Sequence, residues 1–407
     1  MPGHEIFYHR SESTSLTYSG QELKIRENDV GGGYGIRVLS DGRIGFAYCQ
    51  EEAGIKDAIE KAEKLSRFSV QSPFSFSPET SFSSPEIFNE KLSPDDYEML
   101  SSVVKQTRDA AESHGGQSRV IAEMASSETR LENTAGFEGS YRSSEISVYA
   151  ETMDADGFGL SYFVSNLKLP DGVALGMEAA EMAKSMQSAK KPESGTYTVV
   201  LELEALGSLL ETALPSFSGD WKRRSISRLK EGEESFSEML SVFDDPLEKG
   251  SETRPFDDEG TASKRKPLVL EGKVASFLYD HENAALEGVK DGGNCIRSSY
   301  ASPPAIGSSN IAISPGDWKS LDELGSYLEI HHMHGSHTSN PTSGDIGMEV
   351  NTAFLVENGK RTPVKGFMIT GNVFDILANI EAMERNVRVF DYLVAPRIAF
   401  RDIKAVS

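Results

Sequence analysis

Four of the eight histidines of this 407-residue chain lie in one short segment, residues 331–337. Alternate residues of a β-strand point to the same face of the sheet. We therefore expect His332 and His334 to lie side by side on a strand, on the face that also carries Leu328 and Ile330. Two imidazoles in that position can bind one zinc, nickel or copper ion, because imidazole is a good ligand for all three.

A third imidazole follows in the same segment. A turn at Gly335 would bring His337 back toward the first two, so the predicted metal site consists of His332, His334 and His337. Histidines at the polar end of a strand can equally face solvent or form hydrogen bonds to other side chains. The sequence leaves both interpretations open.

A second candidate for metal chemistry is the pair His281 and Glu282. Such a pair opens the helix of many zinc peptidases, where the histidine binds the metal, the glutamate activates water and a second histidine follows one turn later. Ala285 and Leu286 occupy the positions where that second ligand is needed. The motif is incomplete, so these two residues are catalytic candidates only if ligands come from elsewhere in the chain.

Other common catalytic motifs are missing from the sequence. Cys49 and Cys295 give neither a disulfide framework nor a Cys-x-x-Cys motif. There is no nucleophile elbow and no phosphate-binding loop, and the glycines at 31–33 lack dinucleotide-binding spacing, so we expect them to form a turn between strands. The carboxylates at 244–245 and 257–259 fit either a hard cation or a loop in which they cap backbone amides.

The overall charge excludes some classes of partner. The chain carries 63 acidic and 41 basic residues, which gives a net charge of −22. Proteins that bind a phosphate backbone need a basic surface, so we expect no direct contact with nucleic acid. No segment approaches the ~20 apolar residues that cross a bilayer, and the first residues do not resemble a secretory signal. These features predict a soluble, cytoplasmic protein that does not enter a membrane.

Strands dominate the elements that must position these residues. An Asp-Gly turn predicts a hairpin between strands at 34–39 and 43–48. Helical spacing of apolar residues predicts a helix within 51–68, a capping Ser93 predicts a second helix, and a third is expected at 173–190. Short separate strands are predicted at residues 5–9, 15–18, 22–26, 118–125, 128–132, 139–150 and 157–165.

The second half of the chain repeats this mixture of strands and helices. A helical period is present in residues 374–385. Strands are predicted at residues 196–203, 267–270, 310–313, 326–332, 351–357, 364–370 and 396–400. The predicted fold class is α+β, with antiparallel sheets flanked by helices in two domains, residues 1–190 and 191–407.

Several short motifs occur in a fixed order along the chain. They are Gly-Ile-Arg-Val-Leu-Ser-Asp-Gly at 35–42, Asn-Thr-Ala-Gly at 133–136, Phe-Asp-Asp-Glu-Gly at 256–260, Thr-Ser-Gly-Asp at 342–345 and Thr-Gly-Asn at 370–372. Together they resemble the motifs of the TldD/PmbA family, whose members have also been called modulators of DNA gyrase. The resemblance spans nearly the whole chain.

This resemblance implies a cytoplasmic two-domain protein from a peptidase system that acts on unfolded peptides. In that family, the TldD subunit carries a His-Glu-x-x-x-His zinc helix and a distant cysteine ligand. The other subunit type, PmbA or TldE, lacks these ligands and pairs with TldD. Family members form dimers, so the resemblance implies a homodimer or a heterodimer here.

The resemblance places the zinc helix of the family at residues 207–219 of this chain. There Glu211 and Ser216 stand where the two histidines would be, and Pro215 would interrupt the helix. No cysteine follows Cys295. The resemblance therefore implies a PmbA (TldE)-like chain with no catalytic zinc and no other cofactor of its own, and with zinc in a TldD-like partner.

The leading hypothesis is thus a subunit of a zinc metallopeptidase system that helps to hold unfolded peptides. One alternative is an autonomous metallohydrolase that uses the histidines of 331–337 together with His281 and Glu282. Another is a binding protein that acts on a protein partner without proteolysis.

Overall fold

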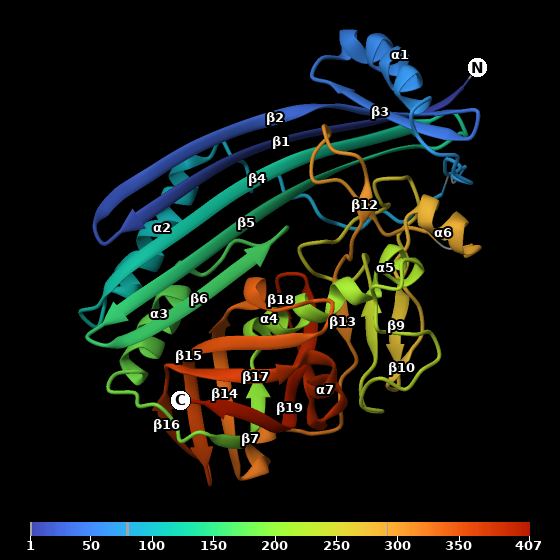
Figure 1. Cartoon of the computed structure of the whole chain (residues 1–407). Helices are drawn as coiled ribbons and strands as arrows, with labels where there is room; N and C mark the ends of the chain where they lie inside the picture. The colour runs from blue at the N-terminus through green and yellow to red at the C-terminus, as the bar shows by residue number, and fades with distance from the viewer. Residues whose placement is uncertain (1, 79–80, 291) are drawn as a thin grey trace.

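The computed structural model describes residues 2–78, 81–290 and 292–407, which form two large sheets. Long antiparallel strands make up the first sheet, in the order β3-β2-β1-β4-β5-β6. Figure 1 shows this sheet arching over the second half of the chain. Its strands are β1 Gly3–Ser19, β2 Glu22–Ser40, β3 Arg43–Cys49, β4 Gln117–Asn133, β5 Glu138–Asp154 and β6 Gly157–Ser165.

The two faces of this sheet have different partners. Leu16, Ala122 and Val148 are buried on one face, in a core that includes residues of helices α2 Tyr97–Ala111 and α3 Gly172–Ser185. His9 and Thr129 are paired across β1 and β4 and lie on the other face. The alternation of side chains along a strand therefore leaves the second face free to contact the rest of the protein.

The predicted hairpin is confirmed, because β2 and β3 pair around Asp41 and Gly42. The strands predicted at 5–9 and 15–18 are parts of one strand, β1. The polar residues between them sit within a paired sheet, and pairing of the backbone does not depend on side-chain polarity.

The prediction of a turn at glycines 31–33 is wrong, because these residues lie inside β2. A Cβ atom on Gly33 would come within 2.5 Å of the ring of Tyr300 and within 2.7 Å of the carbonyl oxygen of Cys49. Gly35 has the same restriction, with Tyr300 O at 2.5 Å. The glycines permit another segment of the chain to approach the strand closely.

Helices of the first half cover the outer face of the sheet. The helix predicted within 51–68 is α1, Ile55–Ser66, preceded by a 3₁₀ turn at Glu52–Gly54. Helix α2 is capped by Asp96, whose side chain accepts the Met99 N–H at 3.0 Å, rather than by the predicted Ser93. The segment between α1 and α2 has an extended course without regular elements over most of its described length.

An eleven-stranded sheet dominates the second half of the chain. Its main order is β10-β9-β8-β13-β19-β17-β15-β14-β7, and β7 also pairs with β19, which closes five of the strands into a ring. Its strands are β7 Gly195–Leu201, β8 Val242–Asp244, β9 Lys266–Leu270, β10 Lys273–Val274, β13 Ile311–Ile313, β14 Ser326–His334, β15 Asp345–Glu357, β16 Lys360–Val364, β17 Phe367–Asn372, β18 Ile380–Phe390 and β19 Leu393–Val406.

Short helices and turns connect these strands. They are α4 Leu203–Ala213, α5 Gly219–Arg223, α6 His281–Glu287, α7 Val373–Ala378 and the 3₁₀ turns Leu214–Phe217, Leu321–Leu324 and Ser336–Thr338. A separate small hairpin is formed by β11 Cys295–Ile296 and β12 Ala305–Ile306. The helix predicted over 374–385 is wrong beyond Ala378, because Ile380 begins a strand that pairs with β19.

The fold is therefore α+β, with mainly antiparallel sheets flanked by helices, as predicted. The strands of the first sheet end at Ser165 and those of the second begin at Gly195. The predicted division at residue 190 lies between them. Within the described part of the chain, none of the helices has the length and apolar character needed to span a membrane.

Candidate functional site

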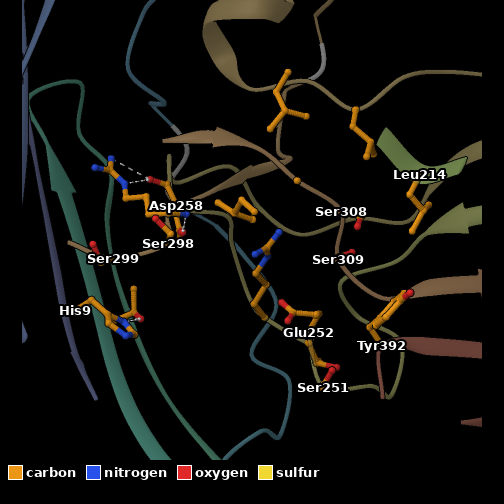
Figure 2. A pocket seen from close by; sticks show the side chains of 18 of the residues that line it. His9, Leu214, Ser251, Glu252, Asp258, Ser298, Ser299, Ser308, Ser309 and Tyr392 are labelled. Carbon is orange, nitrogen blue, oxygen red and sulfur yellow. Dashed lines mark hydrogen bonds between the residues drawn. The ribbon is translucent and has the colours of Figure 1, made fainter. Parts of the chain in front are cut away.

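A cleft of about 770 Å³ lies between the inner face of the first sheet and the second half of the chain (Figure 2). The sheet contributes His9 from β1, Thr129 from β4 and Tyr141 from β5. The opposite wall comes from the second half of the chain: Glu211, Leu214, Pro215, Ser218, Trp221, Ser251 to Arg254, Asp258, Leu278, Ile296 to Ser299, Ile306 to Ser309 and Tyr392. Hydroxyl groups, carboxylates and a few apolar side chains therefore share the surface of the cleft.

The Phe-Asp-Asp-Glu-Gly motif forms a buried turn in this wall. Asp257 accepts backbone N–H groups from Thr261 at 2.8 Å and from Cys295 at 2.9 Å, and Asp258 accepts the Arg297 N–H at 2.7 Å. These contacts correspond to the backbone-capping interpretation of the cluster. Burial raises the pKa of Asp258 to about 6. The carboxyl group of Asp258 is thus held in place next to the cleft, and its pKa lies closer to neutral pH than that of an ordinary aspartate.

Gly260 completes the turn with a positive φ of 79°. A Cβ atom there would also come within 2.8 Å of the Phe137 ring. Phe137 packs with Phe7, Leu131 and Phe256 in a small core between the two halves of the chain. The glycine is thus required both by the backbone conformation and by close packing.

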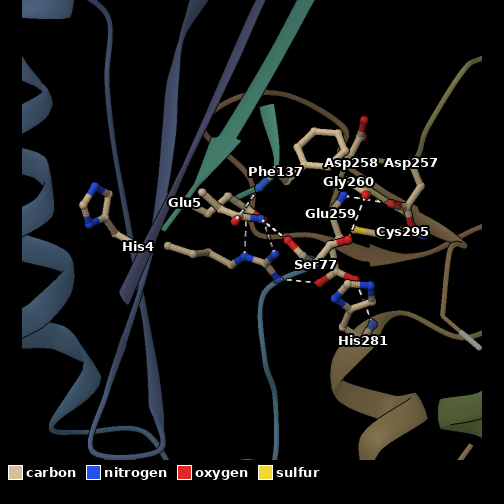
Figure 3. A network of polar contacts seen from close by, with 12 residues as sticks. His4, Glu5, Ser77, Phe137, Asp257, Asp258, Glu259, Gly260, His281 and Cys295 are labelled. Carbon is tan, nitrogen blue, oxygen red and sulfur yellow. Dashed lines mark hydrogen bonds and ion pairs between the residues drawn. The ribbon is translucent and has the colours of Figure 1, made fainter. Parts of the chain in front are cut away.

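A buried ionic network joins the first sheet to this turn (Figure 3). Arg37 donates to Glu5 at 3.0 and 2.8 Å and to Glu259 at 2.5 Å. Arg297 also contacts Glu5. Burial alone would raise the pKa of Glu259, but the attraction of Arg37 holds that pKa below its ordinary value. All four side chains are almost fully buried, so each charge depends on the others.

The structure places His281 and Glu282 at the start of α6, outside the residues that line the cleft. Both ring nitrogens of His281 are engaged: Nε2 with the Thr261 hydroxyl at 2.6 Å and Nδ1 with the Ser75 carbonyl at 3.1 Å. The carbonyl only accepts, so Nδ1 donates to it, while Nε2 is paired with the Thr261 hydroxyl. The arrangement is that of a hydrogen-bonded histidine.

The structure does bring His332 and His334 together. Their Nε2 atoms are 3.0 Å apart, and the rings are nearly perpendicular at 88°. The expectation that they share a face with Leu328 and Ile330 is wrong, because β14 is irregular around His332. Leu328 and Ile330 remain in the core of the second half.

A carboxylate also contacts this pair, because Nδ1 of His332 is hydrogen-bonded to Glu204 at the start of α4. Burial and the neighbouring His332 lower the pKa of His334. A neutral imidazole is the form that binds a metal. The pair therefore has two nitrogen donors close together and an orienting carboxylate.

His337 lies apart in the 3₁₀ turn Ser336–Thr338. Among the described residues, one group of three potential ligands has all its donor atoms within 4.8 Å of one another, and it consists of Glu202, Glu329 and His331. Arginines already bind its carboxylates, for example Arg388 with Glu202 at 2.6 Å. The three predicted ligands His332, His334 and His337 do not form such a group in this structure, and their metal binding stays a prediction.

The segment that the resemblance aligns with a zinc helix lies beside the cleft. Helix α4 ends at Ala213, and Pro215 follows in a 3₁₀ turn. The exposed Glu211 lines the cleft. The fully buried Ser216 points elsewhere, because its hydroxyl donates to the Pro341 carbonyl at 3.3 Å.

Reasoning from the sequence missed Arg254, which also lines the cleft and is only 8% exposed. Its position next to the run of carboxylates at 257–259 is not itself a signal of function. The burial of its guanidinium depends on the contact between the two halves of the chain, which no local pattern shows.

Family models match all three parts of the chain. They describe a PmbA/TldA metallopeptidase domain 1 at residues 4–66, a central domain at 90–187 and a C-terminal domain at 194–407. An uncharacterised protein of Methanocaldococcus jannaschii is 28% identical over 98% of this chain and 95% of its own length. A metalloprotease of Methanothermobacter thermautotrophicus is 26% identical over 93% of this chain and 87% of its own length.

Solved structures show the same fold over the whole chain. A proposed modulator of a DNA gyrase from Thermotoga maritima has a TM-score of 0.90 at 24% identity, covering 100% of this chain and 96% of its own. TldE from Thermococcus kodakarensis has a TM-score of 0.88 at 22% identity, covering 100% and 97%. The matches to all three domains show that the chain belongs to the PmbA/TldD family of metallopeptidases.

Proposed function

We propose that this chain is a PmbA (TldE)-like subunit of a zinc metallopeptidase system that acts on unfolded peptides. In this proposal the chain helps to hold the peptide, and a TldD-like partner supplies the catalytic zinc. The family membership supports a place in a peptidase system. The similarity to a TldE structure supports the fold of this type of subunit.

The observation that carries the proposal is the set of donor groups in residues 207–219. Glu211 offers a carboxylate to the cleft, whereas the hydroxyl of Ser216 is buried and bound to a carbonyl. These groups do not fit a His-Glu-x-x-x-His site, which needs two imidazoles on one helix. Helix α4 also ends at Ala213, before the second position is reached. The proposal therefore assigns zinc-dependent hydrolysis to the partner chain.

The composition of the cleft supports peptide holding with little sequence selectivity. Hydroxyl groups line both walls, with Ser127, Thr129 and Ser143 on the sheet and Ser298 and Ser299 opposite. A hydroxyl group both donates and accepts hydrogen bonds, so it can pair with either polar group of a peptide backbone. An extended chain presents such groups along its whole length, whereas a folded protein has most of them paired internally.

The test compares the purified full chain alone with the same chain co-purified with a TldD-like protein. We expect the chain alone to contain no stoichiometric zinc by elemental analysis and to leave an unstructured fluorogenic peptide intact. With the partner, we expect cleavage that a chelator abolishes. Chelator-sensitive cleavage by this chain alone, lost in His332→Ala, would overturn the proposal.

The alternative of an autonomous metallohydrolase has less support. It requires His281 and Glu282 to act with the histidines of 331–337, but both ring nitrogens of His281 already bind Thr261 and Ser75. A binding protein without proteolysis would show peptide or protein binding but no cleavage with any TldD-like chain. Native mass spectrometry of the co-purified material would also distinguish a homodimer from a heterodimer.

A further inference from the structure

The guanidinium of Arg254 is a buried positive charge at the surface of the cleft. The residue is 8% exposed and lines the cleft. Among the residues that the structure describes, no hydrogen bond or ion pair is formed by its side chain; only its backbone N–H has a partner, the Pro246 carbonyl at 3.0 Å. An arginine has five N–H donors and cannot lose its charge at neutral pH, so burial without an acceptor is unfavourable.

The other two buried arginines of this region form ion pairs with carboxylates, although Nη1 of Arg297 has no hydrogen-bond partner among the described residues. Arg37 binds Glu5 and Glu259, and Arg297 binds Glu5. The carboxylates of Asp257 and Asp258 accept backbone N–H groups. Glu252, two residues before Arg254, is exposed. Arg254 therefore differs from Arg37 and Arg297 in forming no ion pair with a carboxylate among the described residues.

The surroundings of Arg254 keep it charged and leave room for a ligand. Burial would lower the pKa of Arg254, but the charge of Asp258 holds that pKa above its ordinary value. The cleft also contains the Tyr141 hydroxyl, and burial raises the pKa of Tyr141 to about 12, so this group is a neutral donor. Figure 2 shows Asp258, Ser298 and Ser299 close together in the cleft.

Two exposed carboxylates, Glu211 and Glu252, also line the cleft, and the charge of Glu252 acts on Arg254. A negative group of a ligand is therefore attracted to the guanidinium itself and not to the cleft as a whole. The planar guanidinium can bind both oxygens of a carboxylate at once.

We propose that Arg254 binds a carboxylate of the peptide held in the cleft. This inference rests on the proposed peptide-holding function. The carboxylate has two sources in a peptide, the C-terminus and an Asp or Glu side chain, and both offer the same pair of oxygens.

The experiment measures binding of three matched, unstructured, fluorescent decapeptides to the full chain by anisotropy. One has a free C-terminus, the second is its C-terminal amide, and the third is the amide with one central glutamate. We expect a carboxylate-bearing peptide to bind at least tenfold more tightly than the plain amide. Preference for the first peptide identifies the C-terminus, and preference for the third identifies an acidic side chain.

Variants assign this preference to Arg254. In Arg254→Gln the acid and amide peptides should bind equally, at the affinity of the amide for the unchanged chain, whereas Arg254→Lys should keep part of the preference. Arg130→Gln, which removes an exposed arginine outside the cleft, serves as the matched control and should keep all of it. An equal acid preference in the unchanged chain and in Arg254→Gln, or no acid preference in the unchanged chain, overturns the inference.

A small carboxylate separates this inference from the proposed function. N-acetylalanine at millimolar concentration should stabilise the full chain against heat, but should not stabilise Arg254→Gln. If no peptide binds and this response is present, peptide holding fails and the carboxylate site remains. If peptides bind without regard to carboxylates, the carboxylate site fails and peptide holding remains, and if neither probe binds, both fail.

Discussion

The ring of Tyr300 lies against Gly33, so closely that a Cβ atom on the glycine would be 2.5 Å from Tyr300 Cε2. Tyr300 belongs to the connection between β11 and β12, and Gly33 to the middle of β2. The β11–β12 connection also supplies Ser298 and Ser299 to the cleft. Close packing at one glycine therefore positions a wall of the candidate site.

We predict that Gly33→Ala destabilises the protein by about 1–3 kcal/mol, because an added methyl group must displace packed atoms. The carbonyl of Cys49, 2.7 Å from the added atom, belongs to the backbone and cannot rotate away. Gly31→Ala is the matched control, since nothing lies within 4 Å of its Cβ position. Urea unfolding of both variants measures the difference, and equal midpoints would show that the contact is unimportant.

The ionic network between the two halves of the chain gives a second prediction. Arg37→Met should cost about 3–5 kcal/mol of stability, because it leaves the buried Glu259 without its arginine and leaves Glu5 with Arg297 alone. The exposed pair of Arg130 and Glu128 is the control, and Arg130→Met should cost no more than about 1 kcal/mol. Similar losses in the two variants would contradict the assigned role of burial.

We predict that the folded protein loses stability with rising pH because of the half-buried Glu145. Burial, with Asp391 and Glu252 nearby, raises its pKa to about 7. The folded state therefore holds this proton more tightly than the unfolded state, whose pKa is about 4. The resulting stabilisation is fully present below pH of about 4 and is lost as the pH rises through about 7.

Thermal unfolding between pH 5 and pH 8 checks this effect. Glu145→Gln, which stays neutral, should show a smaller decrease in Tm over this range than the unchanged chain. The exposed Glu90→Gln should follow the unchanged chain. A Glu145→Gln profile that coincides with the other two would rule out a contribution from this carboxyl group.

For the histidine pair, we predict that His332→Ala and His334→Ala each weaken binding of added Ni²⁺ to the full chain at least tenfold. Their Nε2 atoms are adjacent in the fold. Glu204→Gln should weaken binding less, since Glu204 orients His332 without offering a ligand to the same ion. Isothermal titration calorimetry measures the affinities. His114→Ala, at an exposed position in another part of the chain, is the control, and His337→Ala tests the third predicted ligand.

The sequence correctly predicted those parts of the fold that depend on residues close together in the chain. The hairpin around Asp41 and Gly42 and the helix α1 depend on a turn dipeptide and on a regular apolar period. The continuity of β1 and the placement of glycines 31–33 inside β2 depend instead on distant segments. Tyr300, far along the chain from Gly33, explains that glycine, and no local pattern contains the contact.

In the candidate site, too, short-range patterns were informative and contacts between distant segments were not predicted. The proximity of His332 and His334 follows from strand periodicity, although the irregularity of β14 changed the face on which they lie. His281 was singled out because of its neighbour Glu282, but its ring is used by Thr261 and Ser75, which come from other segments. The burial of Arg254 likewise arises only when the two halves of the chain meet.

The contact between Glu5 and Arg297 has a consequence for how the protein is made. Glu5 lies in the first strand, and its two buried cationic partners are Arg37 and Arg297. Domains generally fold from the N-terminus during synthesis. The first sheet therefore emerges from the ribosome before all the charged partners of its buried residues have been made. Glu5 gains its second cationic partner only after residue 297 has been translated.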